Sequence, residues 1–275
     1  MRVMDSKAKR LLAHHVINIY QVQMRQLEQS TMLVTATPGQ TVGRGMLLPT
    51  IIVEQRAPLS RLKTIPSDVK TGIMNFANPL VPGGDFQSGI DASEAALCRN
   101  TFLYPELKQM RRKYYYYNIQ HLNDYYFVDR LLYSQKIKVL GDDESLKFLD
   151  HFRYIDVVSV AAPNVRAMFC NGIKPDKQLL YRHIYRRILW TLRLFKNHQV
   201  RVVILGDFGC QRSGNDPALV AQAFSQALKR QEFRGAFTTV YFDINQNARA
   251  YHIFKETLPA TSPQQTIKSS TAVLQ

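Results

Sequence analysis

Apolar residues recur along the chain at two alternating spacings. Between residues 6 and 30 they return every three or four positions, which predicts an amphipathic helix. The same spacing predicts helices at 91–110, 176–197, 217–231 and 246–256. Short apolar runs predict strands at 31–36, 48–55, 70–78, 131–140, 154–164, 202–205 and 237–244.

Strands and helices alternate over most of the length, which predicts a layered α/β fold with helices on both faces of a central mixed sheet. No linker divides the pattern, so we expect one domain over residues 1–257. Residues 258–275 are rich in Pro, Ser, Thr and Gln and are expected to form a flexible tail. Their last five residues, TAVLQ, resemble a coronavirus main-protease recognition sequence and are left out of the fold prediction.

Two local features qualify this pattern. Pro105 is expected to split the 91–110 helix in two. The tyrosine-rich stretch 114–127 is irregular and is expected to be a packed loop or insertion. Tyr114 to Tyr117 could stack on nucleic-acid bases, but packing beneath a loop is the favoured interpretation.

The formal net charge of the 275 residues is +15, which favours polyanionic partners. Two of the three basic clusters fall on predicted helices, where a solvated helix face is the favoured explanation. Nucleic acid is therefore a candidate partner that is not favoured. No apolar run of about 18 residues occurs, so no membrane span is expected.

The cysteines are few and scattered. Cys98, Cys170 and Cys210 show no metal-ligand spacing, so we expect no metal site. Such cysteines fit a reducing compartment, either the cytoplasm or the cytosol of a host that receives a secreted effector.

A glycine-rich turn follows the predicted strand 70–78. Gly83 and Gly84 can adopt backbone conformations closed to other residues and let a ligand approach the main chain. The next helix would present free N–H groups and its positive dipole end to an anion. Three acids lie in the same stretch: Asp85, Asp91 and Glu94.

A second glycine loop follows the strand 202–205. Gly206, Gly209 and Gly214 lead to Asp216, a good helix N-cap, and Pro217, which suits a first helical position. Ligands of open α/β sheets bind beyond the carboxyl ends of the strands. Two such loops side by side would form a cleft for a pyrophosphate. The chain lacks the P-loop and dinucleotide-binding motifs, which disfavours those two classes.

The segments GIMNFAN, PGGDFQSGIDASEAALCRN, VVSVAAPN and VVILGDFGCQRSGNDP, in this order, resemble the macrodomain family. The resemblance is closest to the bacterial type of poly(ADP-ribose) glycohydrolase (PARG) and implies a macrodomain-like three-layer α/β/α fold. It also implies ADP-ribose as ligand or product and no cofactor. The residues it implies as ligand-binding are Asn75, Gly83, Gly84, Gly206, Phe208, Gly209, Cys210, Gln211, Arg212 and Phe242. Phe242 would lie near the adenine.

The chain departs from the family pattern at the catalytic motif. The family's Gln-Glu-Glu falls on Ser93, Glu94 and Ala95, so the second glutamate is missing. Cleavage of an ADP-ribosyl bond needs a proton for the leaving group, an activated water, or both, which two carboxylates can supply. We therefore expect Glu94, Asp85 and Asp91 to be catalytic and to converge on the distal ribose.

Structural roles stay open for some of these residues. Asp91 could instead be an N-cap in a capping box with Glu94. Asn75 could be a turn former only. Phe208 could pack in the core or contact a ribose, and Cys210 is more simply a core residue.

The resemblance implies an ADP-ribosyl hydrolase acting on mono-ADP-ribosylated protein, with arginine as one linkage, or on poly(ADP-ribose). Its partners would be ADP-ribosylated protein and ADP-ribose. A non-catalytic ADP-ribose reader is the alternative, motivated by Ala95. A nucleic-acid-binding protein is the third hypothesis.

Overall fold

Apolar runs build a seven-stranded sheet in the computed structural model of the chain, which describes residues 5–23, 30–43, 45–142, 149 and 151–259. The strands are β1 (Thr31–Val34), β2 (Thr50–Glu54), β3 (Thr71–Phe76), β4 (Leu131–Val139), β5 (Arg153–Val160), β6 (Val202–Leu205) and β7 (Thr239–Asp243). Their order across the sheet is β1-β4-β5-β3-β6-β7-β2.

Five neighbouring strands, β5, β3, β6, β7 and β2, run parallel. Strands β4 and β1 extend one side of the sheet in antiparallel pairing. The parallel pairing places the carboxyl ends of β3, β5 and β6 at one edge, where the segments after Phe76, Val160 and Leu205 begin. The mixed sheet is therefore as the sequence predicts, and its carboxyl edge brings both glycine loops to the same end of the molecule.

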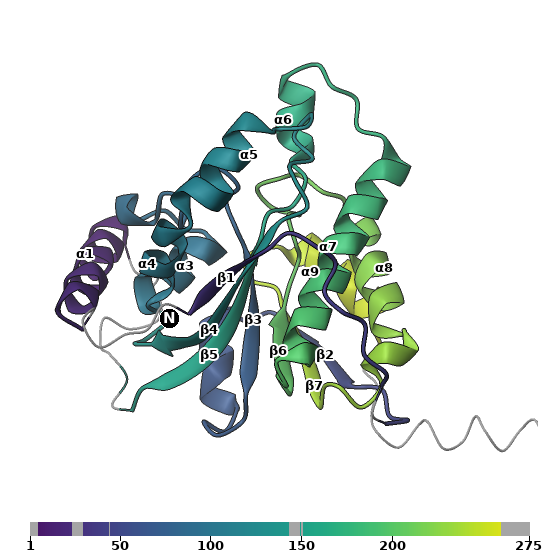
Figure 1. The fold of residues 1–275 in the computed structure, drawn as a ribbon, viewed down its shortest axis with the longest axis horizontal. Coiled ribbons are helices and arrows are strands. Elements are labelled where there is room, and N and C mark those ends of the chain that lie inside the picture. The colour runs from purple at the N-terminus through teal and green to yellow at the C-terminus, as the bar shows by residue number, and fades with distance from the viewer. Residues whose placement is uncertain (1–4, 24–29, 44, 143–148, 150, 260–275) are drawn as a thin grey trace, which may run out of the picture.

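The helices are α1 (Ser6–Gln23), α2 (Pro58–Arg61), α3 (Ser93–Asn100), α4 (Leu103–Gln109), α5 (Tyr117–Gln120), α6 (Val165–Cys170), α7 (Lys177–Asn197), α8 (Pro217–Leu228) and α9 (Ala248–Thr257). Figure 1 shows α1, α3 and α4 on one side of the sheet and α7 and α8 on the other. Each face has its own apolar core. One contains Leu97 and Leu107 of α3 and α4, and the other Ile188 and Phe224 of α7 and α8. The fold is an α/β fold of the macrodomain-like kind.

Several boundaries differ from the prediction. The break in the 91–110 helix falls at Thr101 and Phe102, and Pro105 lies inside the first turn of α4, where its missing N–H costs no hydrogen bond. Residues 111–120 form a π-helical turn and α5 rather than a loop, with Tyr114 and Tyr115 buried in the core.

Other predictions concern residues outside the described ranges. The first helix ends at Gln23, and the part expected at 24–29 lies outside the described residues. The same is true of the tail at 260–275. Short helices α2 and α6 carry too few residues for their spacing to be recognised in the sequence. Among the described residues, no helix combines the length and apolar character needed to cross a membrane.

Candidate active site

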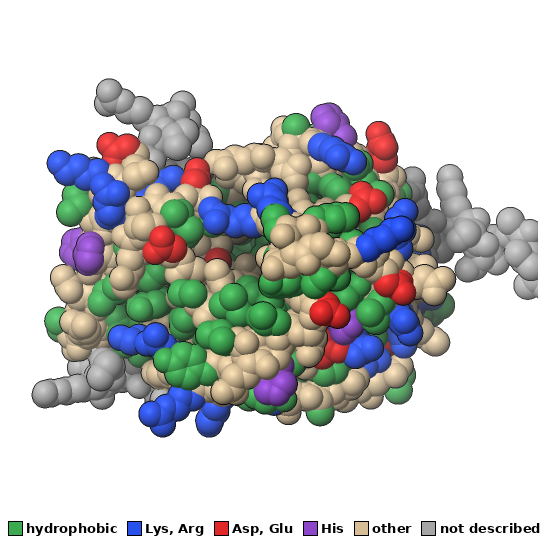
Figure 2. Space-filling view, turned by 90° about the horizontal axis from the view of Figure 1, so that it is seen from above, with side chains coloured by type: hydrophobic (Ala, Val, Ile, Leu, Met, Phe, Trp, Pro, Cys, Tyr) green, Lys and Arg blue, Asp and Glu red, His purple; other side chains and the backbone are tan. Residues whose placement is uncertain are grey.

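Both glycine loops line one cavity of about 320 Å³ at the carboxyl edge of the sheet. Its lining residues are Phe76, Ala77, Asn78, Pro79, Gly83, Gly84, Asp85, Ile90, Ala92, Ser93, Glu94, Ala95, Ala162, Asn164, Asp207, Gly209, Gln211, Arg212 and Ser213. Figure 2 looks down on the end of the molecule from which α6 leaves the sheet. It shows a hollow near the middle, with Lys and Arg side chains beside it. We call this cavity the glycine-loop pocket.

Glu94 lies in the first turn of α3 and is 5% exposed. One carboxylate oxygen accepts a hydrogen bond from the backbone N–H of Asn78 at 2.8 Å, and the other accepts from the Asn75 side chain at 3.3 Å. Burial raises the pKa of Glu94 to about 8, although the hydrogen bonds from Asn78, Asn75 and the Gly83 backbone act in the opposite direction. At neutral pH the Glu94 carboxyl is therefore mainly protonated and can donate a proton.

Asn75 lies behind Glu94 rather than in the pocket lining. It is 1% exposed near the end of β3, where its register partner on β5 is Ser159. Its side-chain amide donates to Glu94 and to Ser159 Oγ at 3.0 Å. The structure therefore places Asn75 as a support for the Glu94 carboxylate.

The other two predicted catalytic acids lie differently. Asp85 is exposed and lines the pocket, on the same loop as Gly83 and Gly84. Asp91 is exposed and lies outside the pocket lining, so the expected convergence of three acids on one ribose is wrong for Asp91. Helix α3 begins two residues later, at Ser93, so Asp91 precedes the helix whereas Glu94 lies in its first turn.

Asp91 instead joins three segments near the pocket rim. Its carboxylate pairs with Lys9 of α1 at 3.3 Å and accepts from Gln246 at 3.2 Å. Its carbonyl oxygen accepts from Arg212 of the second loop at 3.3 Å. Partial burial would raise the pKa of Asp91, but the contacts with Gln246 and Lys9 lower it overall. The N-cap of α3 is Ala92, without a side-chain hydrogen bond, so the capping-box alternative is also wrong.

The second loop contributes Gly209, Gln211, Arg212 and Ser213 to the pocket. Gly209 has φ +72°, and a Cβ there would lie 2.4 Å from both Ala162 Cβ and Asn215 Nδ2. Only glycine therefore fits at this position. Asp216 and Pro217 are the N-cap and first residue of α8, as the sequence predicts.

Asp207 is a pocket residue that the sequence reasoning missed. It follows Gly206 directly, lines the pocket and is 4% exposed. It accepts hydrogen bonds from Asn247 at 2.6 Å and from Gln211 at 3.2 and 3.4 Å. Burial raises the pKa of Asp207, although these two hydrogen bonds act in the opposite direction. An acid between a buried strand and a glycine turn was the signal that could have found it.

Besides Asn75, four residues expected to bind the ligand lie outside the pocket lining. Phe242 is fully buried and packs on Phe224 at 5.1 Å between ring centroids, so it cannot lie against an adenine. Phe208 is also fully buried, and its ring centroid lies 5.7 Å from that of the pocket residue Phe76. Of the two roles left open for Phe208, packing in the core is therefore the one that fits. Gly206 and Cys210 belong to the second glycine loop but do not line the pocket. Burial raises the pKa of the Cys210 thiol.

Within the described ranges, no three His, Cys, Asp or Glu side chains gather in a way that could hold a metal ion. The pocket therefore offers two buried carboxyls, Glu94 and Asp207, one exposed carboxyl, Asp85, and the backbone of two glycine loops. An α/β/α fold with such a pocket at the carboxyl edge defines a macrodomain-like ligand-binding domain.

Comparisons with known proteins narrow this class. Residues 14–142 match the family model of the microbial-type PARG catalytic domain, a span that includes the first glycine loop and Glu94. A crystal structure of PARG from Thermomonospora curvata has a TM-score of 0.79 and 25% identity, over 91% of this chain and 99% of that chain. PARG from Deinococcus radiodurans in complex with ADP-ribose has a TM-score of 0.73 and 25% identity, over 86% and 96%. No curated protein sequence matches the chain.

The chain thus carries the signature of the microbial-type PARG catalytic domain and has the fold of the bacterial PARGs. The T. curvata enzyme has also been solved with the inhibitor ADP-HPD, with a TM-score of 0.77 to this chain. Together these matches support a glycohydrolase enzyme. The family-model match ends before the second glycine loop, so Gly209, Gln211 and Arg212 are placed in the pocket by the structure alone.

Proposed function

We propose that this chain hydrolyses the glycosidic bond of ADP-ribose linkages and that poly(ADP-ribose) is a substrate. The observation that carries the proposal is Glu94, a buried carboxyl at the floor of the glycine-loop pocket whose pKa of about 8 keeps it protonated at neutral pH. A carboxyl in this state suits a general acid of glycoside cleavage. The similarity to bacterial PARG supports the same activity.

In the proposed reaction, the bond between C1″ of the terminal ribose and the leaving oxygen breaks through an oxocarbenium-like state. Glu94 gives its proton to that leaving oxygen. A water molecule then bonds to C1″ and returns a proton to Glu94. Asp85 lines the same pocket from the loop of Gly83 and Gly84, and its carboxylate can assist in activating the water.

The diphosphate of the ligand would lie against the two glycine loops. Gly83, Gly84 and Gly209 all line the pocket and have positive φ, a backbone conformation that favours glycine. Arg212 lines the pocket and is exposed, and among the described residues it donates one hydrogen bond, to the Asp91 carbonyl. Its remaining donors can bind phosphate oxygens.

Mono-ADP-ribosylated protein is the second substrate class that we propose, with arginine as one linkage. Ala95 is 1% exposed and lines the pocket at the position where the sequence reasoning places the missing second glutamate. A smaller, less acidic floor favours a leaving group other than ribose. We propose free ADP-ribose as the product, without a cofactor, and a reducing cytosol as the place of action.

A non-catalytic ADP-ribose reader is the alternative, because Ala95 takes the place of the second glutamate and leaves the pocket floor with one acid fewer. The test is a release assay on poly(ADP-ribose) and on acceptors modified through arginine, glutamate or serine, each assayed separately. Release from polymer supports the first proposal, and release from arginine acceptors supports the second. Binding of ADP-ribose in calorimetry without release from any substrate would establish the reader, and no binding at all would favour a nucleic-acid-binding protein.

A further inference from the structure

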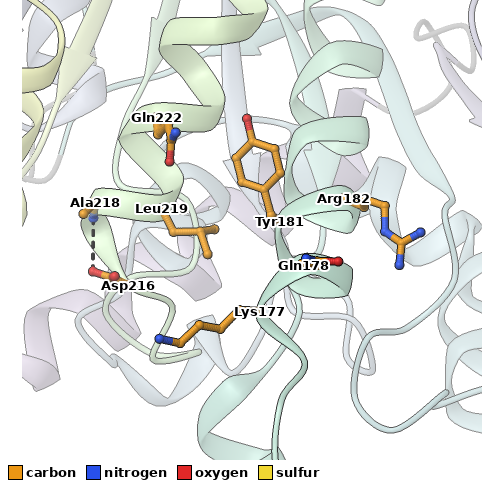
Figure 3. A pocket seen from close by; sticks show the side chains of 8 residues that line it. All are labelled: Lys177, Gln178, Tyr181, Arg182, Asp216, Ala218, Leu219 and Gln222. Atoms are coloured by element: carbon orange, nitrogen blue, oxygen red, sulfur yellow. Dashed lines mark hydrogen bonds between the residues drawn. The ribbon is translucent and has the colours of Figure 1, made fainter.

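A second cavity, an open groove of about 580 Å³, lies between the first turns of α7 and α8. Its lining residues are Lys177, Gln178, Tyr181, Arg182, Asp216, Ala218, Leu219 and Gln222. Figure 3 shows the Tyr181 ring standing between the two helices, with Lys177 and Leu219 below it. We call this cavity the α7–α8 groove. None of its lining residues belongs to the glycine-loop pocket.

The groove combines cations with an aromatic ring. Lys177 and Arg182 are both exposed, and within the described ranges neither forms an ion pair. The Tyr181 hydroxyl donates to Gln226 at 2.6 Å, and its ring stacks on Tyr185 at 5.9 Å between centroids. The ring is therefore fixed in place. Fixed aromatic rings beside Lys and Arg bind the bases and phosphates of nucleotides.

The one carboxylate in the groove is engaged in its own helix. Asp216 is the N-cap of α8 and accepts from the backbone N–H of Ala218 at 3.1 Å (Figure 3). Asp176, the N-cap of α7, likewise accepts from the N–H groups of Gln178 and Leu179. Each carboxylate offsets the positive end of its helix. Arg182 also interacts electrostatically with Asp176, and both Arg182 and Lys177 are exposed to an anion in the groove.

The second glycine loop links the pocket and the groove along the chain. Ser213 lines the pocket and Asp216 lines the groove, and only Gly214 and Asn215 lie between them in the sequence. Arg166 of α6 contacts this loop. Its backbone N–H donates to the Ser213 carbonyl at 3.0 Å, and its guanidinium donates to the Gln211 carbonyl at 3.2 Å. Arg212 of this loop, Arg166 beside it and Lys177 in the groove are all exposed cations.

We propose that the α7–α8 groove binds a further ADP-ribose unit of a polymer whose end occupies the glycine-loop pocket. The adenine of that unit stacks on Tyr181, and its diphosphate lies at Lys177 and Arg182. This inference rests on the proposed function, because it assigns a second subsite for the same polymeric substrate.

The experiment compares ADP-ribose with poly(ADP-ribose) oligomers of two, three and four units, by calorimetry with a Glu94→Gln protein that is not expected to cleave them. We expect oligomers to bind more tightly than ADP-ribose. Lys177→Glu and Arg182→Glu should each remove most of this gain, and Tyr181→Ala should weaken oligomer binding by roughly tenfold. None of the three should change the affinity for ADP-ribose.

Lys229→Glu is the matched control, since it makes the same charge change at an exposed position at the other end of α8. Lys177→Glu places an acid in the first turn of α7, which the helix dipole favours, so the variant should fold. If Glu94→Gln fails to fold, kinetics of the active protein give the same test. The KM for polymer should then rise in the groove variants, while inhibition by ADP-ribose stays constant.

Two results would overturn the inference without touching the proposed function. In one, the protein binds ADP-ribose, and oligomers bind more tightly than ADP-ribose by the same factor in the wild type and in the groove variants. The other is a single-stranded oligonucleotide that binds as tightly as the polymer and loses its affinity in the same variants, which would assign the groove to nucleic acid. Absence of ADP-ribose binding in the wild-type protein would instead contradict the proposed function itself.

Discussion

Asn75 and Glu94 are joined by a hydrogen bond of 3.3 Å between the side-chain amide of Asn75 and the carboxylate of Glu94, across 19 positions of sequence. The bond connects the end of a central strand with the first turn of α3. It fixes a buried carboxyl at the floor of the glycine-loop pocket, where a free side chain would be expected to turn toward water. The protonation of this carboxyl has consequences for stability and for catalysis.

The Glu94→Gln substitution should change the pH dependence of stability. Because the pKa of Glu94 is raised in the folded state to about 8, its contribution to stability is present below the ordinary value of 4.5 and is lost as pH rises through about 8. Between about pH 5 and 8, the free energy of unfolding should fall in the wild type by on the order of 3 kcal/mol relative to Glu94→Gln. Urea unfolding at a series of pH values measures this difference.

The control for that experiment is Glu106→Gln. Glu106 is as little exposed as Glu94 but lies in α4, outside the pocket, where it accepts a hydrogen bond from the Thr31 hydroxyl at 2.7 Å. This variant should keep the wild-type slope. If Glu106→Gln reduces the pH dependence of the free energy of unfolding as Glu94→Gln does, that dependence does not arise from Glu94.

Catalysis should depend on pH in the same window. If protonated Glu94 is the general acid, kcat/KM for release of ADP-ribose is constant below about pH 7 and falls up to tenfold per pH unit above about 8. Initial rates on poly(ADP-ribose) between pH 6 and 10 give the profile. A rate that rises steadily through this range would mean that Glu94 acts as a base or does not act.

Gly209→Ala should damage the pocket and the fold together. A Cβ at this residue would lie 2.4 Å from Ala162 Cβ, on backbone with φ +72°. Gly172 has almost the same φ, +71°, but nothing lies within 4 Å of its Cβ position. Gly172→Ala should therefore cost about 1 kcal/mol from the backbone alone, and Gly209→Ala clearly more. Thermal unfolding compares the two, and ADP-ribose binding should weaken only in Gly209→Ala.

Asp207→Asn should strengthen binding of ADP-ribose at high pH. Burial raises the pKa of Asp207 above its ordinary 3.8, so the carboxyl is neutral at low pH and becomes negative, in the pocket proposed to bind the diphosphate, as pH rises through its raised pKa. Wild-type affinity should fall across that ionisation. The Asn variant should not show this fall and should bind on the order of tenfold more tightly above it.

Calorimetry from pH 4 to 9 measures these affinities. Asp216→Asn is the control for Asp207→Asn, because Asp216 is exposed, lies outside the pocket, and asparagine caps a helix as well as aspartate does. Its affinity for ADP-ribose should follow the wild-type curve. An Asp207→Asn protein that binds more weakly at every pH would mean that the carboxylate contacts the ligand favourably.

The order of strands and helices and the meeting of the two glycine loops could be predicted from the sequence. Both follow from local rules, because apolar spacing identifies the elements and parallel strands bring their carboxyl ends together. The N-cap Asp216 and Pro217 at the start of α8 were predicted for the same reason. The role of Asp91 could not be predicted, since it depends on Lys9, Gln246 and Arg212.

The roles of two aromatic residues could not be predicted either, because they too depend on residues distant in sequence. Phe208 and Phe242 carry no local signal that separates a core ring from a ligand-facing ring, and only the packing of α8 and α9 on the sheet buries them. Asp207 was missed because a buried acid is recognised by its surroundings and not by its neighbours in sequence. The amides of Gln211 and Asn247 that hold it are 4 and 40 positions away.

The release of free ADP-ribose from poly(ADP-ribose) at pH 7, measured for the wild type and for Glu94→Gln, shows whether Glu94 is the general acid. We expect release by the wild type and a rate at least about 100-fold lower for Glu94→Gln, with ADP-ribose affinity retained. Equal rates in the two proteins would contradict the account, because the buried carboxyl at the pocket floor would then have no part in the reaction.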